Sequence, residues 1–165
     1  MDLTELDPTD RTLIMAMQDD CTQSLAALGE RVGLKPPAVL ERVRRLERSG
    51  IVLGYHAQID ARAAGLDIGA FIGVGIDHPK YMAAFEKAVL AIPAVLECHH
   101  VTGRHTLMLK IRTQNTESLH ALISELRELP GVDRTETMIV LDTKLERTKI
   151  ELPPIDEAKP RRRGR

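Results

Sequence analysis

The amino-acid sequence predicts an α+β protein with two domains: an N-terminal winged helix-turn-helix domain and a C-terminal ferredoxin-like βαββαβ domain with an antiparallel sheet. Three short helical patterns, the second and third each followed by a glycine, occupy roughly the first fifty residues. Beyond residue 65 the pattern becomes strand, helix, strand, strand, helix, strand. We therefore expect a helix-turn-helix domain at 1–54, a connector strand and linker at 55–65, an αβ domain at 66–149 and a disordered basic tail at 150–165.

Composition narrows the class of protein. Of 165 residues, 43% are hydrophobic and 28% charged, which is typical of a globular protein and not of a disordered or membrane protein. Aromatic residues make up only 2%, so the chain lacks a stacking surface for single-stranded nucleic acid. The acidic start lacks the layout of a secretion signal, and we expect a cytoplasmic protein. The net charge of −1 does not exclude DNA, because a groove responds to local charge.

The first two helices have clear start and stop signals. Asp7 is a good N-cap in front of Pro8, and the inward stripe that follows is Leu13, Ile14 and Met17. Ser24 is expected to cap a second helix at 25–32, and Gly33 to end it in a left-handed conformation.

The third helix is expected to begin at Lys35-Pro36-Pro37, because proline is tolerated in a first turn, and to end at Gly50. One face is apolar: Val39, Leu40, Val43 and Leu46. The segment is otherwise cationic, with Arg42, Arg44, Arg45 and Arg48 against Glu41 and Glu47. A solvated face with ion pairs such as Glu41 to Arg45 is one interpretation. The position favours another, since the second helix of such a pair enters the DNA major groove.

The remaining elements follow from apolar periodicity and turn signals. We expect a strand followed by a connector within 51–60, and strands at 70–76, 95–101, 107–111 and 135–141. We expect helices at 79–91 and from the cap Thr116 to Pro130. Gly69, Gly73 and Gly75 share the side of Phe71, where they would let another backbone approach. We expect Phe71, Val95 and Val101 on the sheet face that no helix covers, and a dimer formed through this face.

The two cysteines, Cys21 and Cys98, are widely separated, and we expect both to be small buried hydrophobes. An enzyme or metal site would have to use Cys98, His99, His100 and His105. On a strand, Cys98 and His100 share one face while His99 points away, so these side chains do not converge on one ion. No catalytic residue, metal or cofactor is therefore expected.

Motifs in both domains resemble one family. They are Asp10-Arg11, Leu-Gly-Glu-Arg-Val-Gly-Leu at 28–34, Leu-Glu-Arg-Val-Arg-Arg-Leu-Glu-Arg-Ser-Gly-Ile at 40–51, Gly54-Tyr55, Glu97-Cys98-His99, Val101-Thr102-Gly103, Leu129-Pro130-Gly131-Val132 and Thr135-Glu136-Thr137. In this order they resemble the Lrp/AsnC family of leucine-responsive and asparagine regulators, from Asp7 to about Lys149. The resemblance implies a sequence-specific, double-stranded-DNA-binding transcription regulator of amino-acid or related metabolism. It also implies a homodimer, with assembly into tetramers or octamers.

By this resemblance, the recognition helix is 36–49, and its DNA-binding residues are Lys35, Pro37, Ala38, Glu41, Arg42, Arg45 and Arg48. We assign Pro37, Ala38, Glu41 and Arg42 to base edges and the other three to phosphates. Arg42→Ala should then lose discrimination between operator and scrambled DNA, whereas Arg48→Ala should weaken both alike.

The resemblance also implies a small-molecule effector at an interface between subunits. The expected contacts are Val101, Gly103, Arg104, Thr106, Thr135 and Thr137. Many members carry Asp where this chain has Thr106, so an amino-acid ammonium group would lose its carboxylate partner. Arg104 and His105 would then suit an anionic or aromatic ligand. Lys35 replaces the usual Ser or Thr cap of the recognition helix, at a cost of about 1 kcal/mol.

Three alternatives stay open at this stage. The chain could be an architectural DNA binder without an effector, or a metal-binding or siroheme-decarboxylase-like enzyme of the same layout. The hairpin at 102–105 could be a polar turn without a ligand. The five cations of the tail, from Lys159 onward, could add phosphate contacts or could only solubilise the chain.

Overall fold

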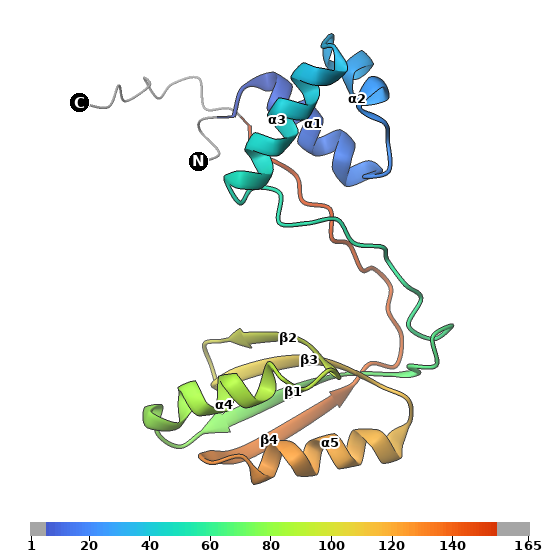
Figure 1. The fold of residues 1–165 in the computed structure, drawn as a ribbon. Helices are drawn as coiled ribbons and strands as arrows, with labels where there is room; N and C mark the ends of the chain where they lie inside the picture. The colour runs from blue at the N-terminus through green and yellow to red at the C-terminus, as the bar shows by residue number, and fades with distance from the viewer. Residues whose placement is uncertain (1–5, 155–165) are drawn as a thin grey trace, which may run out of the picture. The chain divides into compact units, whose positions relative to one another are not determined.

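The structure is a computed structural model, and it describes residues 6–154. The chain divides into two compact units. The first contains the chain up to Ala57 together with the segment from Glu146 onward, and the second is Gln58–Leu145. Two chain segments therefore join the units (Figure 1). The sequence predicts only one connector, at 55–65.

The first unit contains three helices, α1 (Pro8–Asp19), α2 (Leu25–Val32) and α3 (Pro36–Arg48). They enclose an apolar core: Leu13, Ala16, Met17, Leu28, Val39 and Val43. A second cluster contains Leu6, Ile14 and Leu46. The helix-turn-helix prediction is confirmed, because α2 and α3 follow one another through a short turn.

Most predicted caps of these helices form. The side chain of Asp7 accepts a hydrogen bond from the backbone N of Asp10 at 2.8 Å, and that of Ser24 accepts from Ala27 at 3.2 Å. Gly33 follows α2 with φ of 68°, the left-handed conformation expected of a glycine stop.

Lys35 makes no side-chain cap on α3, as expected. The free-energy cost of having Lys instead of Ser or Thr at this cap is smaller than about 1 kcal/mol, because Pro36 and Pro37 have no N–H group that needs an acceptor. The next two donors, the backbone nitrogens of Ala38 and Val39, both reach the carbonyl oxygen of Lys35, at 3.0 and 3.2 Å. The prolines therefore compensate for the missing cap.

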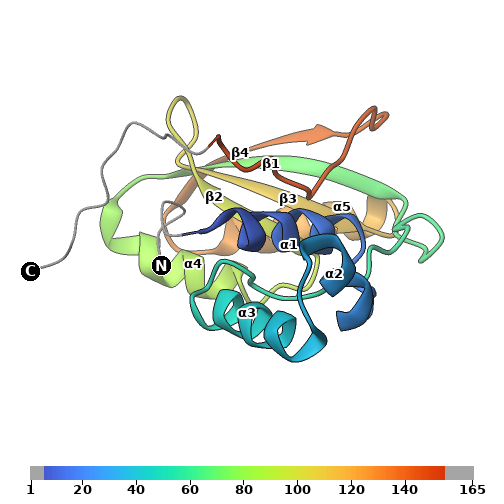
Figure 2. The same cartoon turned by 90° about the horizontal axis from the view of Figure 1, so that it is seen from above.

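The second unit is a four-stranded antiparallel sheet with the order β2-β3-β1-β4, the ferredoxin-like arrangement that the sequence predicts. Its elements are β1 (Ile68–Ile76), the 3-10 helix η2 (Pro79–Tyr81), α4 (Met82–Val89), β2 (Val95–His100), β3 (Leu107–Thr113), α5 (Thr116–Glu128) and β4 (Val132–Ile139). Both helices lie on the same side of the sheet (Figure 1 and Figure 2). The core between them contains Ala70, Ile72, Val74, Phe85, Val89, Leu107, Leu109, Ile111, Leu119, Leu122 and Leu126.

Two local predictions were wrong. No strand forms at residues 51–60, although Leu53, Tyr55 and Ile59 alternate as a strand would. An extended segment becomes a strand only when another strand pairs with it, and no part of the described chain does so here. The cap of α5 is Asn115 rather than Thr116, since Asn115 and Ser118 exchange hydrogen bonds in a capping box.

Two side chains also differ from the prediction, Val95 in the face of the sheet on which it lies and Cys21 in its burial. Val95 packs against the helix-side core, because the pairing register shifts between Val95 and Glu97 and reverses the faces. Cys21 is exposed in the turn after α1, whereas Cys98 is half-buried against the core. Burial raises the pKa of the Cys98 thiol.

Two glycines of β1, Gly73 and Gly75, lie under side chains of the same chain. A Cβ at Gly73 would meet the ring of His105 at 2.6 Å, and one at Gly75 would meet the Asp133 carboxylate at 2.2 Å. Side chains of the same chain therefore lie over Gly73 and Gly75. Phe71 remains 38% exposed on the same face.

Candidate nucleic-acid interface

The exposed side of α3 carries a row of residues at helical spacing. Pro37, Glu41, Arg44 and Arg48 are spaced by four, three and four residues, and all are exposed. Ala38 and Lys35 are exposed beside the start of the row. Within residues 6–154, neither Arg44 nor Arg48 has a hydrogen bond or an ion pair. Both guanidinium groups are therefore available to an anion.

Arg42 and Arg45 are engaged differently, because they converge on carboxylates of α1. Arg42 Nη1 lies 2.6 Å from Asp7 Oδ2 and 2.8 Å from Asp10 Oδ1. Arg45 Nη2 lies 2.6 Å from Asp10 Oδ2. Asp10 is only 1% exposed, so it is a buried carboxylate bridged by two arginines. We call these four residues the α1–α3 charge cluster.

The contacts of the cluster change the pKa of Asp7 and of Arg42. Partial burial raises the pKa of Asp7, but hydrogen bonds from Arg42 and from the backbone of Asp10 outweigh it, and the net pKa is lowered. The hydrogen bonds to Asp7 and Asp10 raise the pKa of Arg42. Each shift favours the charged form, which strengthens the contact between α1 and α3.

Glu47, the second glutamate of α3, also has a hydrogen-bond partner. Tyr55 Oη donates to Glu47 Oε1 at 3.0 Å, and burial, followed by this hydrogen bond, raises the pKa of Tyr55 to about 12. The ion pair between Glu41 and Arg45 that the sequence allowed does not form, because Arg45 turns to Asp10.

The predicted DNA-binding residues thus fall into two groups. Five are exposed: Lys35, Pro37, Ala38, Glu41 and Arg48. Arg42 and Arg45 are half-buried in the charge cluster. Arg44 belongs with the exposed group and was not among the predicted residues, although its spacing of three from Glu41 and seven from Pro37 is the signal that would have found it.

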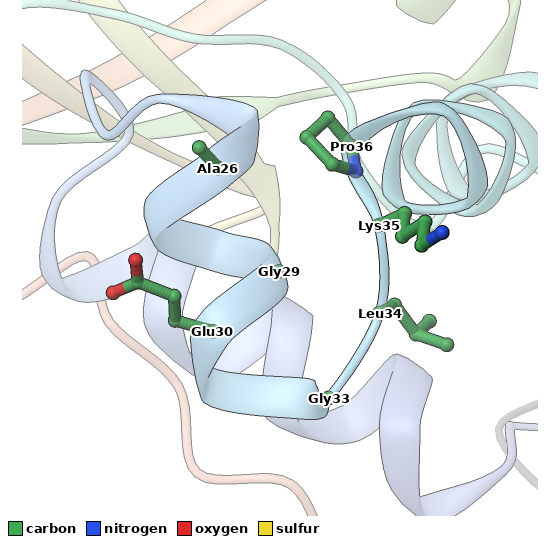
Figure 3. A pocket seen from close by; sticks show the side chains of 7 residues that line it. All are labelled: Ala26, Gly29, Glu30, Gly33, Leu34, Lys35 and Pro36. Carbon is green, nitrogen blue, oxygen red and sulfur yellow. The ribbon is translucent and has the colours of Figure 1, made fainter.

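A shallow hollow of about 420 Å³ lies at the turn between α2 and α3 (Figure 3). Its lining is Ala26, Gly29, Glu30, Gly33, Leu34, Lys35 and Pro36. The side chains of Glu30 and Lys35 point in opposite directions, so the two charged groups do not converge on a ligand. We interpret the hollow as the surface left by the tight turn.

The predicted effector residues do not gather at one point in a single chain. Thr135 and Thr137 pair with Val74 and Ile72, which places them on the helix-covered face. The hydroxyl of Thr135 accepts from Arg127 Nε at 2.8 Å. Thr106 Oγ1 accepts from the backbone N of Ile76 at 3.2 Å, so it satisfies a donor at the end of β1.

The other members lie in the hairpin between β2 and β3. Val101 closes it, with its backbone N donating to the Thr106 oxygen at 3.1 Å, and Gly103 has φ of 115°. Arg104 Nη2 and His105 Nε2 lie 3.4 and 3.0 Å from the same oxygen of Glu136 in β4. Glu136 was not among the predicted residues.

His105 is also the most confined polar group of this region. Its side chain is 8% exposed, and its Nδ1 has no hydrogen-bond partner within the described residues. The ring lies over Gly73, where any Cβ would displace it. The hairpin therefore has a fixed basic side chain next to the Glu136 carboxylate.

The Cys and His residues of β2 do not form a site together. Cys98 packs toward the helix-side core, whereas His99 lies on the surface with its Nε2 3.0 Å from Glu97 Oε2. In residues 6–154, no three His, Cys, Asp or Glu side chains lie where they could hold one metal ion. None of the helices in this range is long and apolar enough to cross a membrane.

A helix-turn-helix unit with a cationic exposed helix, joined to a ferredoxin-like unit, defines a two-domain DNA-binding protein. The comparisons with known proteins identify which kind. The AsnC-type helix-turn-helix domain matches residues 6–47, and the Lrp/AsnC ligand binding domain matches residues 69–150. The chain belongs to the Lrp/AsnC family, and it is a DNA-binding transcription regulator with a ligand-binding domain.

Similarity extends over nearly the whole chain. It is 33% identical to the HTH-type transcriptional regulator FL11 of Pyrococcus horikoshii, over 89% of this chain and 97% of that protein. It is 35% identical to the leucine-responsive regulatory protein of Escherichia coli K12, over 84% and 86% of the two chains.

Solved structures are similar in both units. The leucine response regulatory protein LrpA of Mycobacterium tuberculosis has a TM-score of 0.80 and 31% identity, covering 90% of this chain and 100% of that one. A transcriptional regulator of Neisseria meningitidis, solved as a complex with L-Met, has a TM-score of 0.83 and 28% identity, covering 88% and 96%. The predicted family and fold are thereby confirmed.

Proposed function

We propose that this regulator reads DNA with the exposed row of α3 and holds that helix in place with the α1–α3 charge cluster. Pro37, Ala38, Glu41 and Arg44 would face base edges, while Lys35 and Arg48 would contact phosphates. This proposal moves Arg42 from reading bases, and Arg45 from contacting phosphate, to positioning α3. Its main support is that Arg42 is bound to two carboxylates, whereas Arg44 has no partner within residues 6–154.

The experiment compares Arg44→Ala with Arg42→Ala. Arg44→Ala should weaken binding to a genomic fragment selected by the protein by about 1–3 kcal/mol, the value of a base contact, and leave the free energy of unfolding unchanged. Arg42→Ala should lower the free energy of unfolding, because it leaves a buried carboxylate with one partner fewer.

Arg48→Ala provides the matched control for phosphate binding. It should weaken binding to selected and scrambled DNA equally, because a phosphate contact carries no sequence information. If Arg42→Ala instead lost discrimination at unchanged stability, the assignment made from the sequence would hold and the one proposed here would fail.

For the second unit, we propose binding of an amino acid or a related metabolite at an interface between subunits, with no catalytic step, in a protein that acts in the cytoplasm. A single chain brings Arg104, His105 and Glu136 together but leaves Thr135 and Thr137 on the other face of the sheet. A ligand that touches both groups therefore needs a second copy. Glu136 offers the carboxylate that Thr106 lacks, for an ammonium group.

The test is a panel of amino acids and keto acids in thermal unfolding, followed by DNA binding with any stabilising compound. Glu136→Gln should abolish stabilisation by an amino acid but keep stabilisation by the matching keto acid, since only the first has an ammonium group. An architectural binder would respond to no compound and would bind many sequences with similar affinity.

A further inference from the structure

The chain segment that returns to the helix-turn-helix unit lies along α1. Residues 146–154 belong to this unit, and we call them the C-terminal strap (Figure 1). The side chain of Gln18 pairs with the backbone of Ile150 in both directions: Nε2 donates to its oxygen at 3.1 Å, and Oε1 accepts from its nitrogen at 2.8 Å. The sequence predicts a disordered tail at 150–165; residues 150–154 of it lie on α1, and 155–165 lie outside the described residues.

Further polar contacts lie on either side of this pair. Lys149 Nζ pairs with Asp19 near the end of α1, and the Arg11 guanidinium donates to the carbonyl oxygen of Pro153 near its start. Asp19 and Arg11 are eight residues apart, which is about 12 Å along a helix. The strap therefore runs antiparallel to α1 over much of its length.

The strap is also held by burial in the second apolar cluster of the unit, which consists of Leu6, Ile14 and Leu46. Leu152 is half-buried against this cluster. Ile51 and Val52, which follow α3, pack on the same cluster, and their backbone nitrogens both donate to the Leu46 oxygen, at 3.1 and 3.2 Å. Leu46 is fully buried, so the strap packs on the inward side of α3 and leaves the exposed row of that helix uncovered.

Both chain segments that join the two units are thus anchored in the helix-turn-helix unit. The outgoing segment is held at Ile51 and Val52 and again at Tyr55, whose hydroxyl donates to Glu47 at 3.0 Å. The returning segment is held by the strap. Each residue of a connecting segment has two soft backbone dihedrals. A unit on one segment can turn about all of them, whereas a second anchored segment allows only those turns that both segments permit.

The returning segment is the shorter of the two. From Ile139, the last residue of β4, to Lys149 there are ten residue steps, which span at most about 33–36 Å. From Tyr55 to Ile68, the first residue of β1, there are thirteen steps, which span at most about 43–47 Å. While the strap is bound to α1, the shorter segment therefore limits the movement of the helix-turn-helix unit.

We propose that the strap determines which spacing of DNA half-sites this regulator accepts. The strap restricts the rotation of the helix-turn-helix unit, so the two α3 helices of a dimer reach only half-sites with one separation along the duplex. The partner is double-stranded DNA that carries two half-sites. Gln18 and Leu152 are positioning residues, which act through the strap and do not touch DNA. The inference rests on the proposed DNA binding by α3 and on a dimer, and it adds a second kind of specificity to base reading.

The experiment changes the spacing in the DNA. The probe is the genomic fragment selected by the wild-type protein, with five or ten base pairs inserted at its centre of symmetry, about half a helical turn and one turn. Affinity is measured by fluorescence anisotropy. With five inserted, wild-type affinity should fall about 100-fold, since the gain from a second linked contact is about 10²–10⁴-fold and is lost when geometry forbids both contacts. With ten inserted, part of this loss should be recovered, because both half-sites again lie on one face.

The release variant combines Gln18→Ala with Leu152→Ala, which removes both hydrogen bonds to Ile150 and the apolar contact with Leu46. Its loss of affinity with five inserted base pairs should be about 10-fold or less, because each α3 can then turn toward its half-site. Gln18→Ala favours the helix, and circular dichroism checks the fold. Hydrogen exchange checks the strap: the Ile150 amide should be protected in the wild type and exchange freely in this variant.

The slack variant keeps every contact of the strap. Three glycines inserted between Asp142 and Thr143, which are both exposed, lengthen the returning segment by about 10 Å. The loss with five inserted base pairs should shrink as in the release variant, while the Ile150 amide stays protected. Because the insertion lies outside the helix-turn-helix unit, this variant decides the outcome alone if the release variant does not fold.

Glu151→Gln is the matched control. Glu151 lies in the strap between Ile150 and Leu152, is exposed, and makes no hydrogen bond or ion pair within the described residues. Its affinity for all three duplexes should stay within about two-fold of wild type, as for most changes of exposed residues.

The outcomes separate the strap from DNA binding itself. A wild type that binds none of the duplexes would refute the proposed function. Three results would overturn the role of the strap while DNA binding stands: a wild type that binds but ignores the inserted base pairs, a wild type with an unprotected Ile150 amide, or a folded release or slack variant that loses as much affinity as the wild type with five inserted base pairs.

Discussion

Asp10 joins α1 to α3 through two arginines. It is 1% exposed, and its two oxygens each accept from a different arginine of α3. A buried carboxylate is tolerated only when it is paired in this way. The sequence showed the arginines but not their partner, because Asp10 is 32 residues from Arg42 and 35 from Arg45 along the chain. In the sequence, Asp10 stood out only as part of the motif Asp10-Arg11.

Removing this charge should therefore destabilise the helix-turn-helix unit. Asp10→Asn keeps the shape of the side chain but leaves Arg45 without a carboxylate partner and Arg42 with Asp7 alone. The cost should be about 2–4 kcal/mol, because both arginines reach solvent. Urea unfolding followed by circular dichroism measures the loss. Glu30→Gln, an exposed carboxylate of α2, is the control and should change stability by less than about 0.5 kcal/mol. Equal stability of the two variants would contradict the structural role of the cluster.

Asp7 gives the same cluster a pH dependence. Its pKa is lowered below 3.8, so its contribution to stability is present above that pH and is lost as the pH falls through the lower value. The effect should be small, because the side chain is 40% exposed and water screens the pair. Thermal unfolding between about pH 5 and pH 2 should show a shallower acid loss for Asp7→Asn than for the wild type. If the unfolding temperatures of Asp7→Asn and wild type fell in parallel with pH, Asp7 would not contribute to the pH dependence of stability.

At the scale of elements, the turn between α2 and α3 depends on a glycine inside a helix. The backbone N of Leu34 donates to the Gly29 oxygen at 3.0 Å, and a Cβ at Gly29 would lie 2.3 Å from the Leu34 oxygen. The sequence did not single out Gly29, because the reason for it is a close approach of backbone and not a turn conformation. Gly33 was predicted correctly, since its φ of 68° is a local requirement of the helix end.

Gly29→Ala should therefore weaken both the fold and DNA binding. The alanine gains about 1 kcal/mol of helix propensity, but the clash is with backbone, which cannot move aside, and overpacking of this kind costs about 1–3 kcal/mol. We expect a net loss of stability and a lower affinity for DNA, measured on the same preparation. Ala26→Ser, an exposed change on α2, is the control. A variant more stable than wild type would mean that the turn can relax.

Whether an element could be predicted depended on where its determinants lie. Helix starts at Asp7 and Ser24 were predictable because cap and helix are neighbours in sequence. The strand expected at 51–60 was not formed, because alternation shows the capacity to pair and says nothing about a partner. The face of Val95 was missed for a related reason. A register shift in β2 depends on the geometry of its pairing with β3, which no pattern of side chains reveals.

At the scale of the whole molecule, the face of the sheet away from the helices carries the apolar surface that the sequence associated with a dimer. Phe71 and Met138 are neighbours on paired strands, with 38% and 44% exposure. Lys110, opposite Phe71 in β3, pairs with Glu97 at 3.1 Å, and contacts with His99 and Lys110 lower the pKa of Glu97. A small apolar centre with a rim of charged pairs is a common composition for a protein interface.

The dimer prediction can be tested with a charge at the centre of this face. Phe71→Lys should shift the protein to monomer in sedimentation, because it buries an unpaired ammonium group next to Lys110 in any dimer that uses the face. It should not unfold the monomer, since Phe71 is partly exposed and outside the helix-side core. Leu90→Lys, a 76% exposed apolar residue just after α4, adds the same charge on the other side of the sheet and should leave assembly unchanged. If Leu90→Lys alone disrupted assembly, the subunits would meet through the helix side, and the effector groups around Arg104 and Glu136 would not lie at that interface.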